Sequence, residues 1–130
     1  MVRTQAAETA LIPTESVEQQ HLFQWARMMS AVHPELGLLY KITNEGRRTR
    51  ANGARMVAEG MKKGVPDICL PVARGGHHGL YIELKRERNS RVTPEQLGWI
   101  NALINQGYVA AVCRGCDEAI HLITEYLAGR

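Results

Sequence analysis

The sequence contains no run that approaches the roughly 20 apolar residues of a membrane-spanning helix. Its first residues, from Met1 to Pro13, lack the basic start and the apolar core of a signal peptide. No internal repeat or low-complexity segment is evident in the remainder. We therefore expect no membrane partner, a mobile leader over residues 1–13 and a single domain over residues 14–130.

Cysteine is scarce, and its count is odd, since Cys69, Cys113 and Cys116 are the only three. An odd count does not favour the disulfide framework of a secreted protein, so we expect a reducing, cytoplasmic setting. Cys113 and Cys116 form a CxxC pair, which could be half of a zinc site or a redox pair. Because no second CxxC exists and the pair is predicted to join a strand to a helix, we favour a structural role.

The remaining composition is that of an ordinary globular domain, with 45% hydrophobic and 22% charged residues. The net charge of +3 is modest, yet 11 of the 16 basic residues fall in two clusters. Such clusters suit a polyanion, because each cation that contacts a phosphate releases condensed counterions. An ordinary solvated surface is the alternative. The clusters are Lys41, Arg47, Arg48, Arg50, Arg55, Lys62 and Lys63, and then Lys85, Arg86, Arg88 and Arg91.

Hydrophobic periodicity predicts a first helix over residues 17–32, with Leu22 and Ala26 on its apolar face. Ser16, followed three residues later by Gln19, predicts a capping box at its start. A strand is expected over residues 38–42. A short helix is expected over residues 49–59, although Gly53 weakens it.

Two short apolar strands, over residues 67–70 and 80–85, are predicted to form a hairpin across the loop 71–79. Thr93, Pro94 and Gln96 then predict a helix with an N-cap, a first-turn proline and a capping box. A buried strand over residues 108–113 and a last helix over 117–127 follow. A strand, a crossover helix and a strand imply a parallel pair, so we predict one mixed α/β domain. The expected buried stripe of the second long helix is Leu97, Ile100, Leu103 and Ile104.

Acidic and basic side chains converge on the predicted hairpin. Asp67 ends the run Gly64-Val65-Pro66-Asp67, and Glu83 and Lys85 follow it on the second strand. Alternate side chains of a strand share a face, so Glu83 and Lys85 point the same way. Two carboxylates beside a lysine are what a metal-dependent phosphodiesterase needs, since Mg²⁺ prefers oxygen ligands.

We therefore interpret Asp67 and Glu83 as ligands of Mg²⁺, with Mn²⁺ as a substitute, together with the main-chain carbonyl of Leu84. Lys85 is expected to orient or deprotonate the attacking water and to offset developing negative charge. The alternative is an exposed strand face that carries a Glu–Lys pair. His77 and His78, in a glycine-rich loop, are interpreted as solvent-exposed turn residues.

The combined pattern resembles the VRR-NUC family, the virus-type replication-repair nucleases of the PD-(D/E)XK superfamily. The resemblance spans residues 16–127 and rests on the runs Gly64-Val65-Pro66-Asp67, Ile82-Glu83-Leu84-Lys85, Thr93-Pro94-Glu95-Gln96 and Gln106-Gly107-Tyr108. It implies a restriction-endonuclease-like core of helix, three antiparallel strands, helix and parallel strand, the order already expected from periodicity.

The resemblance also implies site residues. It places Glu18, in the first helix, at the metal site, and Gln96 among the catalytic residues. A helix-start carboxylate and a capping glutamine are the alternative interpretations of these two. Asn44 resembles a loop residue of the family. The predicted DNA-contacting residues are Lys41, Asn44, Arg47, Arg48, Arg50, Arg55, Lys62, Lys63, Arg86 and Arg88.

A Mg²⁺-dependent DNA endonuclease is the resulting functional prediction. Compact bacterial or phage members of the family act as homodimers on branched DNA such as four-way junctions, and the resemblance implies the same here. Two alternatives stay open at this point. One is a repair nuclease acting on flaps or linear duplex, and the other is a catalytically silent nucleic-acid-binding module.

Overall fold

A computed structural model describes residues 12–43, 50–87 and 90–130. The described part is an α/β domain with a four-stranded sheet in the order β1-β2-β3-β4. The elements along the chain are α2 (Glu15–Met29), the 3₁₀ helix η1 (Pro34–Leu38), β1 (Tyr40–Lys41), α3 (Arg50–Ala58), β2 (Ile68–Leu70), β3 (Leu80–Lys85), α4 (Pro94–Asn105), β4 (Val109–Arg114) and α5 (Cys116–Leu127).

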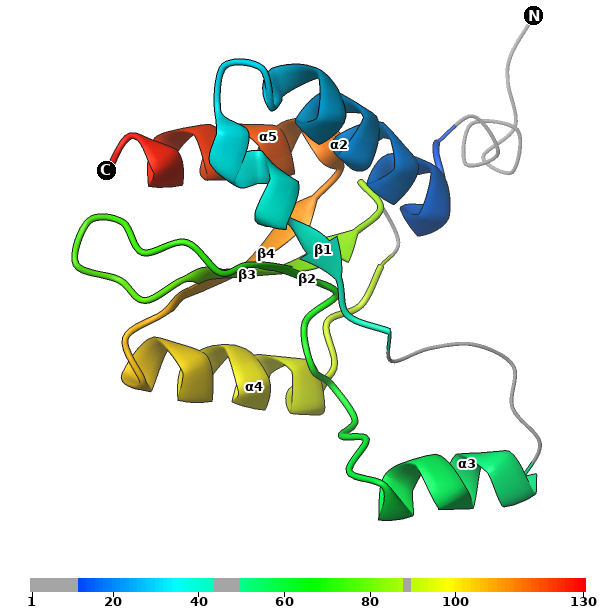
Figure 1. The fold of residues 1–130 in the computed structure, drawn as a ribbon. Helices are drawn as coiled ribbons and strands as arrows, with labels where there is room; N and C mark the ends of the chain where they lie inside the picture. Colours follow the sequence, from blue (N-terminus) through cyan, green and yellow to red (C-terminus); the bar gives the residue numbers. More distant parts are fainter. Residues whose placement is uncertain (1–11, 44–49, 88–89) are drawn as a thin grey trace, which may run out of the picture.

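Helices cover both faces of this sheet. Figure 1 shows α2 and α5 on one face and α4 on the other. The pairs β1–β2 and β2–β3 are antiparallel, whereas β3 and β4 are parallel and are connected through α4. The expected hairpin, the crossover and the mixed α/β class are therefore all confirmed.

The core lies between the sheet and the pair α2 and α5. The alternate residues Leu80, Ile82 and Leu84 of β3 are at most 1% exposed, which places one face of this strand fully in the core. Leu22 and Ala26 of α2 pack into the same cluster at a spacing of four residues, one helical turn. The buried cluster also contains Ile68, Leu70, Ala119 and Ile123.

The first helix begins two residues before the predicted start. Thr14, and not Ser16, is its N-cap, and the Thr14 hydroxyl accepts a hydrogen bond from the Val17 amide over 3.3 Å. The helix ends at Met29 instead of residue 32. The following strand is also shorter than predicted, because the segment through Leu38 forms η1 and leaves only Tyr40 and Lys41 in β1.

Helix α4 begins as predicted, with Thr93 as N-cap and a complete capping box. Its predicted buried stripe is wrong in part. Ile100 is buried, but Leu97 and Ile104 are 48% and 49% exposed. These two are seven residues apart, two helical turns, so they share one side of α4 that the sheet does not cover.

Helix α3 stands away from the sheet, at the lower right of Figure 1. None of its residues is buried, and Val57 is 60% exposed. Every helix within the described ranges is too short or too polar to traverse a bilayer.

The predicted leader, residues 1–13, falls outside the described residues except at its end. There, the carbonyl of Ile12 accepts a hydrogen bond of 3.0 Å from Nη2 of Arg86.

Candidate functional site

The hairpin of β2 and β3 brings the predicted acidic and basic residues together. Ile68 pairs with Ile82, so Asp67 stands just before the paired segment and next to the second half of β3. Oδ2 of Asp67 accepts a hydrogen bond of 2.9 Å from the Leu84 amide. Because Leu84 itself points into the core, its neighbours Glu83 and Lys85 point to the opposite face, as the alternation predicts.

The turn before Asp67 depends on glycine. Gly64 has a φ of 91°, and a Cβ built there would lie 2.7 Å from the main-chain carbon of Glu95. Both facts exclude any residue other than glycine at position 64. A positive φ strains residues with a Cβ, and the contact would be far shorter than van der Waals distance. The run from Gly64 to Asp67 therefore packs tightly against the start of α4.

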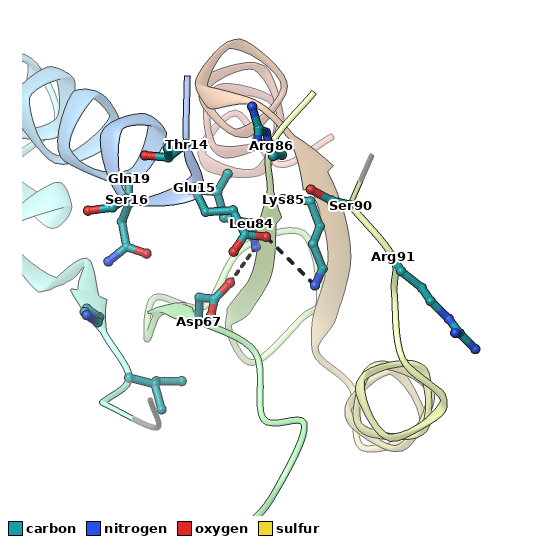
Figure 2. Close-up of a pocket in the computed structure, with 12 residues that line it drawn as sticks. Thr14, Glu15, Ser16, Gln19, Asp67, Leu84, Lys85, Arg86, Ser90 and Arg91 are labelled. Carbon is teal, nitrogen blue, oxygen red and sulfur yellow. Dashed lines mark hydrogen bonds and ion pairs between the residues drawn. The ribbon is translucent and has the colours of Figure 1, made fainter. Parts of the chain in front are cut away.

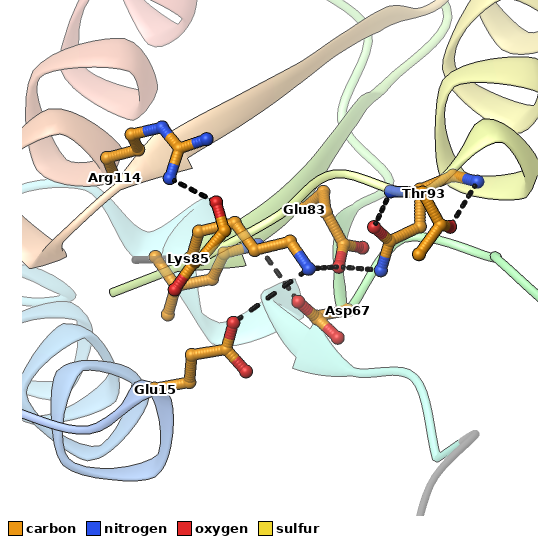
Figure 3. Close-up of polar contacts among 9 residues, drawn as sticks. Glu15, Asp67, Glu83, Lys85, Thr93 and Arg114 are labelled. Carbon is orange, nitrogen blue, oxygen red and sulfur yellow. Dashed lines mark hydrogen bonds and ion pairs between the residues drawn. The ribbon is translucent and has the colours of Figure 1, made fainter. Parts of the chain in front are cut away.

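An ion-pair chain links the two strand residues to α2. Nζ of Lys85 lies 3.7 Å from Oε1 of Glu83 and 3.9 Å from Oε1 of Glu15. Glu83 is 2% exposed and Lys85 is 7% exposed, so this contact is shielded from solvent. Figure 3 shows the ammonium group between the two carboxylates. The field of these carboxylates therefore favours a cation at this point, and Lys85 supplies one.

Gln96 makes one contact that fits each of its two interpretations. Its side-chain oxygen accepts a hydrogen bond of 2.9 Å from the Thr93 amide, which completes the capping box. Its side-chain nitrogen donates to Oε1 of Glu83 over 2.8 Å. The capping and site interpretations are thus compatible, because one planar amide serves both contacts.

A cavity of ≈ 520 Å³ opens over these residues, between α2 and the sheet. Figure 2 shows Glu15, Ser16 and Gln19 reaching from α2 toward it, opposite Asp67 and Lys85. Glu83 and Gln96 do not line it themselves: Glu83 pairs with the lining residue Lys85, and Gln96 donates to Glu83. The lining residues are Thr14, Glu15, Ser16, Gln19, Lys41, Ile42, Asp67, Leu84, Lys85, Arg86, Ser90 and Arg91.

Glu18, the helix carboxylate expected at the metal site, lies elsewhere in the structure. It is 6% exposed, and its Oε2 accepts a hydrogen bond of 2.7 Å from the Cys116 amide at the first turn of α5. Glu15, one helical turn earlier, faces the cavity in its place. A sequence signal for this difference exists, because Glu18 shares the four-residue spacing of the core residues Leu22 and Ala26.

Three cations line the cavity besides Lys85: Lys41 and Arg86, which the sequence predicts as DNA contacts, and Arg91, which belongs to the second basic cluster. Four further predicted contacts are exposed and do not line it. Of these, Arg55 pairs with Glu59 and Lys63 with Glu95, while Arg50 and Lys62 complete the set. The other predicted contacts, Asn44, Arg47, Arg48 and Arg88, lie outside the described residues.

The donor set at the cavity has the chemistry of a magnesium site. Asp67 and Glu15 contribute carboxylate oxygens, Glu83 adjoins them, and no cysteine or histidine is among the described lining residues. Over the described ranges, no group of three or more histidine, cysteine or acidic side chains is arranged to hold a metal. Mg²⁺ fits such a site, because it usually takes one or two carboxylates and fills its other positions with water and phosphate.

The CxxC pair is buried in the fold. Cys113 is 3% exposed, and this burial, with a smaller effect of Glu118, raises the pKa of its thiol to about 12. Burial also raises the pKa of Cys116, and the nearby Glu18 carboxylate adds to that effect. Both groups are therefore neutral thiols at physiological pH, as a structural role requires.

Known proteins are similar to this chain in sequence and in fold. A family model described as the VRR-NUC domain matches residues 4–117. A solved structure titled a VRR_NUC domain protein is 31% identical in sequence and superimposes with a TM-score of 0.78, and the match covers 89% of this chain and 89% of that chain. A search of curated proteins found no match.

Proposed function

Because the chain belongs to the VRR-NUC family, whose domain is a nuclease of the PD-(D/E)XK type, we propose that it is a Mg²⁺-dependent DNA endonuclease. The observation that carries this proposal is the position of Lys85. Its ammonium lies 3.7 Å from Glu83 in a cavity that Asp67 lines.

Asp67, Glu83 and the main-chain carbonyl of Leu84 are the groups that would hold the metal, and the carboxylate of Glu15 faces the same cavity. Mn²⁺ would suit the same oxygen ligands. When bound, Mg²⁺ supplies Lewis-acid stabilisation of the phosphoryl oxygens and lowers the pKa of a bound water. Glu18 is the less favoured ligand, because its carboxylate is engaged with the amide of Cys116.

Lys85 has two tasks in this proposal. Its ammonium offsets the negative charge that develops on the phosphate, and it orients the attacking water by hydrogen bonding. Both tasks need a fixed side chain, and the contacts with Glu83 and Glu15 hold it. Gln96 positions Glu83 and does not itself reach the cavity.

Lys41, Arg86 and Arg91 contact the phosphates on either side of the scissile bond in this proposal, because they line the same cavity as Lys85. The exposed cations Arg50, Arg55, Lys62 and Lys63 extend the positive surface toward α3. Such contacts position a nucleic acid without reading its sequence.

We further propose that the substrate is branched DNA, such as a four-way junction, and that the protein acts as a homodimer. A twofold dimer carries two identical sites, which can cut two strands of a symmetric junction. This finer assignment rests on the family resemblance and on that symmetry argument.

Strand cleavage on a labelled four-way junction, a flap and a matched linear duplex tests the proposal. Each substrate is incubated with Mg²⁺ or with EDTA, using the wild-type protein and the Lys85→Met variant. Methionine keeps the buried apolar stem and removes the charge. Arg130→Ala, which removes an exposed cation paired with Glu125, is the matched control. Thermal unfolding of each variant verifies that it is folded.

Paired, symmetric cuts on the junction, lost with EDTA and in Lys85→Met but kept in Arg130→Ala, are the expected result. Cleavage of the flap or the duplex in preference to the junction would replace the junction assignment by a repair nuclease. Binding without cleavage of any substrate would leave a DNA-binding module in its place. Sedimentation at several protein concentrations tests the homodimer separately.

A further inference from the structure

The catalytic cavity continues along α2 as a second groove. This groove has a volume of ≈ 380 Å³ and shares Ser16, Gln19 and Lys41 with the cavity. It extends from there toward the C-terminal half of the helix. Its lining residues are Ser16, Gln19, Gln20, Phe23, Gln24, Arg27 and Lys41.

All of these residues except Lys41, which belongs to β1, lie on one face of α2. Ser16, Gln20, Phe23 and Arg27 recur at intervals of three or four residues, next to the buried face of Leu22. Among the described residues that line the groove, none is acidic. The catalytic cavity differs, because Glu15 and Asp67 line it. A groove free of carboxylates that leads away from a metal-type site accepts a negatively charged chain.

The side chains in the groove offer the contacts that a nucleic-acid strand needs. Arg27 and Lys41 are exposed, and neither forms an ion pair with any residue of the described ranges, so both can bind phosphate. The ring of Phe23 is half-buried and supplies a surface on which a base can stack. Gln19, Gln20 and Gln24 carry amides that donate to phosphate and sugar oxygens and that also accept from base edges.

We propose that the groove along α2 binds a single strand of DNA as it leaves the catalytic cavity. The inference rests on the proposed nuclease function and adds a binding site to it. From Ser16 to Arg27 the helix rises about 16 Å. At about 3.4 Å per stacked nucleotide, this length matches roughly five nucleotides that lie along the helix face. The site is therefore one for a strand that is unpaired next to the scissile phosphate, either in a single-stranded arm or at the branch point of a junction.

Fluorescence anisotropy in EDTA measures this binding without cleavage. Two labelled substrates are compared: a blunt duplex, and the same duplex with a single-stranded arm of about five nucleotides. Arg27→Ala removes the cation at the far end of the groove, and Arg130→Ala removes an equally exposed arginine that does not line it. Phe23→Leu keeps an apolar side chain against the core and removes the aromatic ring.

We expect Arg27→Ala to weaken binding of the armed substrate and to reduce the slope of log affinity against log salt by about one. Phe23→Leu is expected to lower the affinity for the armed substrate roughly fivefold or more. Neither change should alter the affinity for the blunt duplex. Arg130→Ala should leave the affinity for both substrates unchanged. Thermal unfolding in parallel identifies any loss caused by instability of the fold.

The results separate this inference from the nuclease proposal. If the wild type cleaves DNA while both groove variants bind the armed substrate normally, the groove is not a strand site and the nuclease proposal stands. If the variants lower the affinity for both substrates equally, the groove binds duplex DNA and the single-strand assignment is wrong. A wild-type protein that binds no DNA at all would overturn both proposals.

Discussion

The side-chain amide of Gln96 donates a hydrogen bond of 2.8 Å to Oε1 of Glu83, while its oxygen caps α4 through the Thr93 amide. The start of the crossover helix and the carboxylate of the site are thus held by one side chain. A change at Gln96 therefore affects both stability and activity. The two effects can be separated experimentally.

Gln96→Glu should lower cleavage by about 10²-fold, because Glu83 loses its donor and faces a second carboxylate. The cap should survive, since a glutamate accepts from the Thr93 amide equally well. Thr93→Ala is the complementary change, and it should lower the free energy of unfolding by about 1 kcal/mol with a smaller effect on cleavage. Thermal unfolding and initial cleavage rates measure the two effects. Equal rates for Gln96→Glu and the wild type would contradict the positioning role.

Glu15 and Glu18 should behave oppositely when each is changed. Glu15→Gln is expected to lower cleavage without lowering stability, because Glu15 faces the cavity and Lys85. Glu18→Ala should lower the free energy of unfolding by about 1–3 kcal/mol, because the buried Cys116 amide loses its acceptor. Glu18→Gln retains an acceptor oxygen, so its free energy of unfolding should be close to that of the wild type. A normal rate in Glu15→Gln combined with loss of activity in Glu18→Gln would instead favour Glu18 as the metal ligand.

Two glycine-to-alanine changes should shift stability in opposite directions. Gly115 has a φ of 90°, and a Cβ there would lie 2.7 Å from Oε2 of Glu18, so Gly115→Ala should destabilise the fold by roughly 1–3 kcal/mol. Gly98 lies inside α4 with no neighbour within 4 Å of its added Cβ, so Gly98→Ala should stabilise by about 0.5–1 kcal/mol. Urea unfolding of the two variants tests the pair. A neutral Gly115→Ala would show that Glu18 can move aside.

The thiol of Cys113 should make the fold sensitive to alkaline pH. Burial raises its pKa from 9.0 to about 12. Between these values the unfolded chain loses the proton while the folded chain retains it, so the free energy of unfolding should fall as the pH rises through this range. At pH 8 alkylation of Cys113 and Cys116 should be slow in the folded protein and fast in denaturant. Mass spectrometry of iodoacetamide-treated protein measures this, with rapid labelling of folded protein as the contrary result.

Much of the fold is predictable from local pattern. The alternation in β3 has a period of two, so the apolar residues Ile82 and Leu84 settle the face on which Glu83 and Lys85 lie. The capping box at Thr93 can be predicted directly from the sequence, because it requires only these residue types at this spacing. The length of β1 could not be predicted in the same way, since η1 takes up the residues before it.

The direction in which the two helix carboxylates point could be predicted only in part. A carboxylate in a first turn is stabilised by the helix dipole whichever way it faces. Its direction depends on the neighbouring elements, and here the Cys116 amide of α5 donates a hydrogen bond to Glu18. The exposure of Leu97 also depends on neighbouring elements. The sheet covers only one side of α4, and the apolar residues of the helix extend around its circumference beyond that side.

The pairing of Ile68 with Ile82 has a consequence for how the chain reaches this structure. A slip of β3 by one residue would turn Glu83 and Lys85 toward the apolar core under α2 and α5, and would place Ile82 and Leu84 beside Asp67 and Gln96. Two charges would then enter an apolar interior, at a cost that a marginally stable domain cannot bear. The polar residues of the proposed catalytic site thus also help to fix the register of the strand pairing. If Glu83 and Lys85 were replaced by apolar residues, the proposed cleavage activity would be lost. The slipped register would also no longer bury charges, so mispaired strands would be less strongly disfavoured.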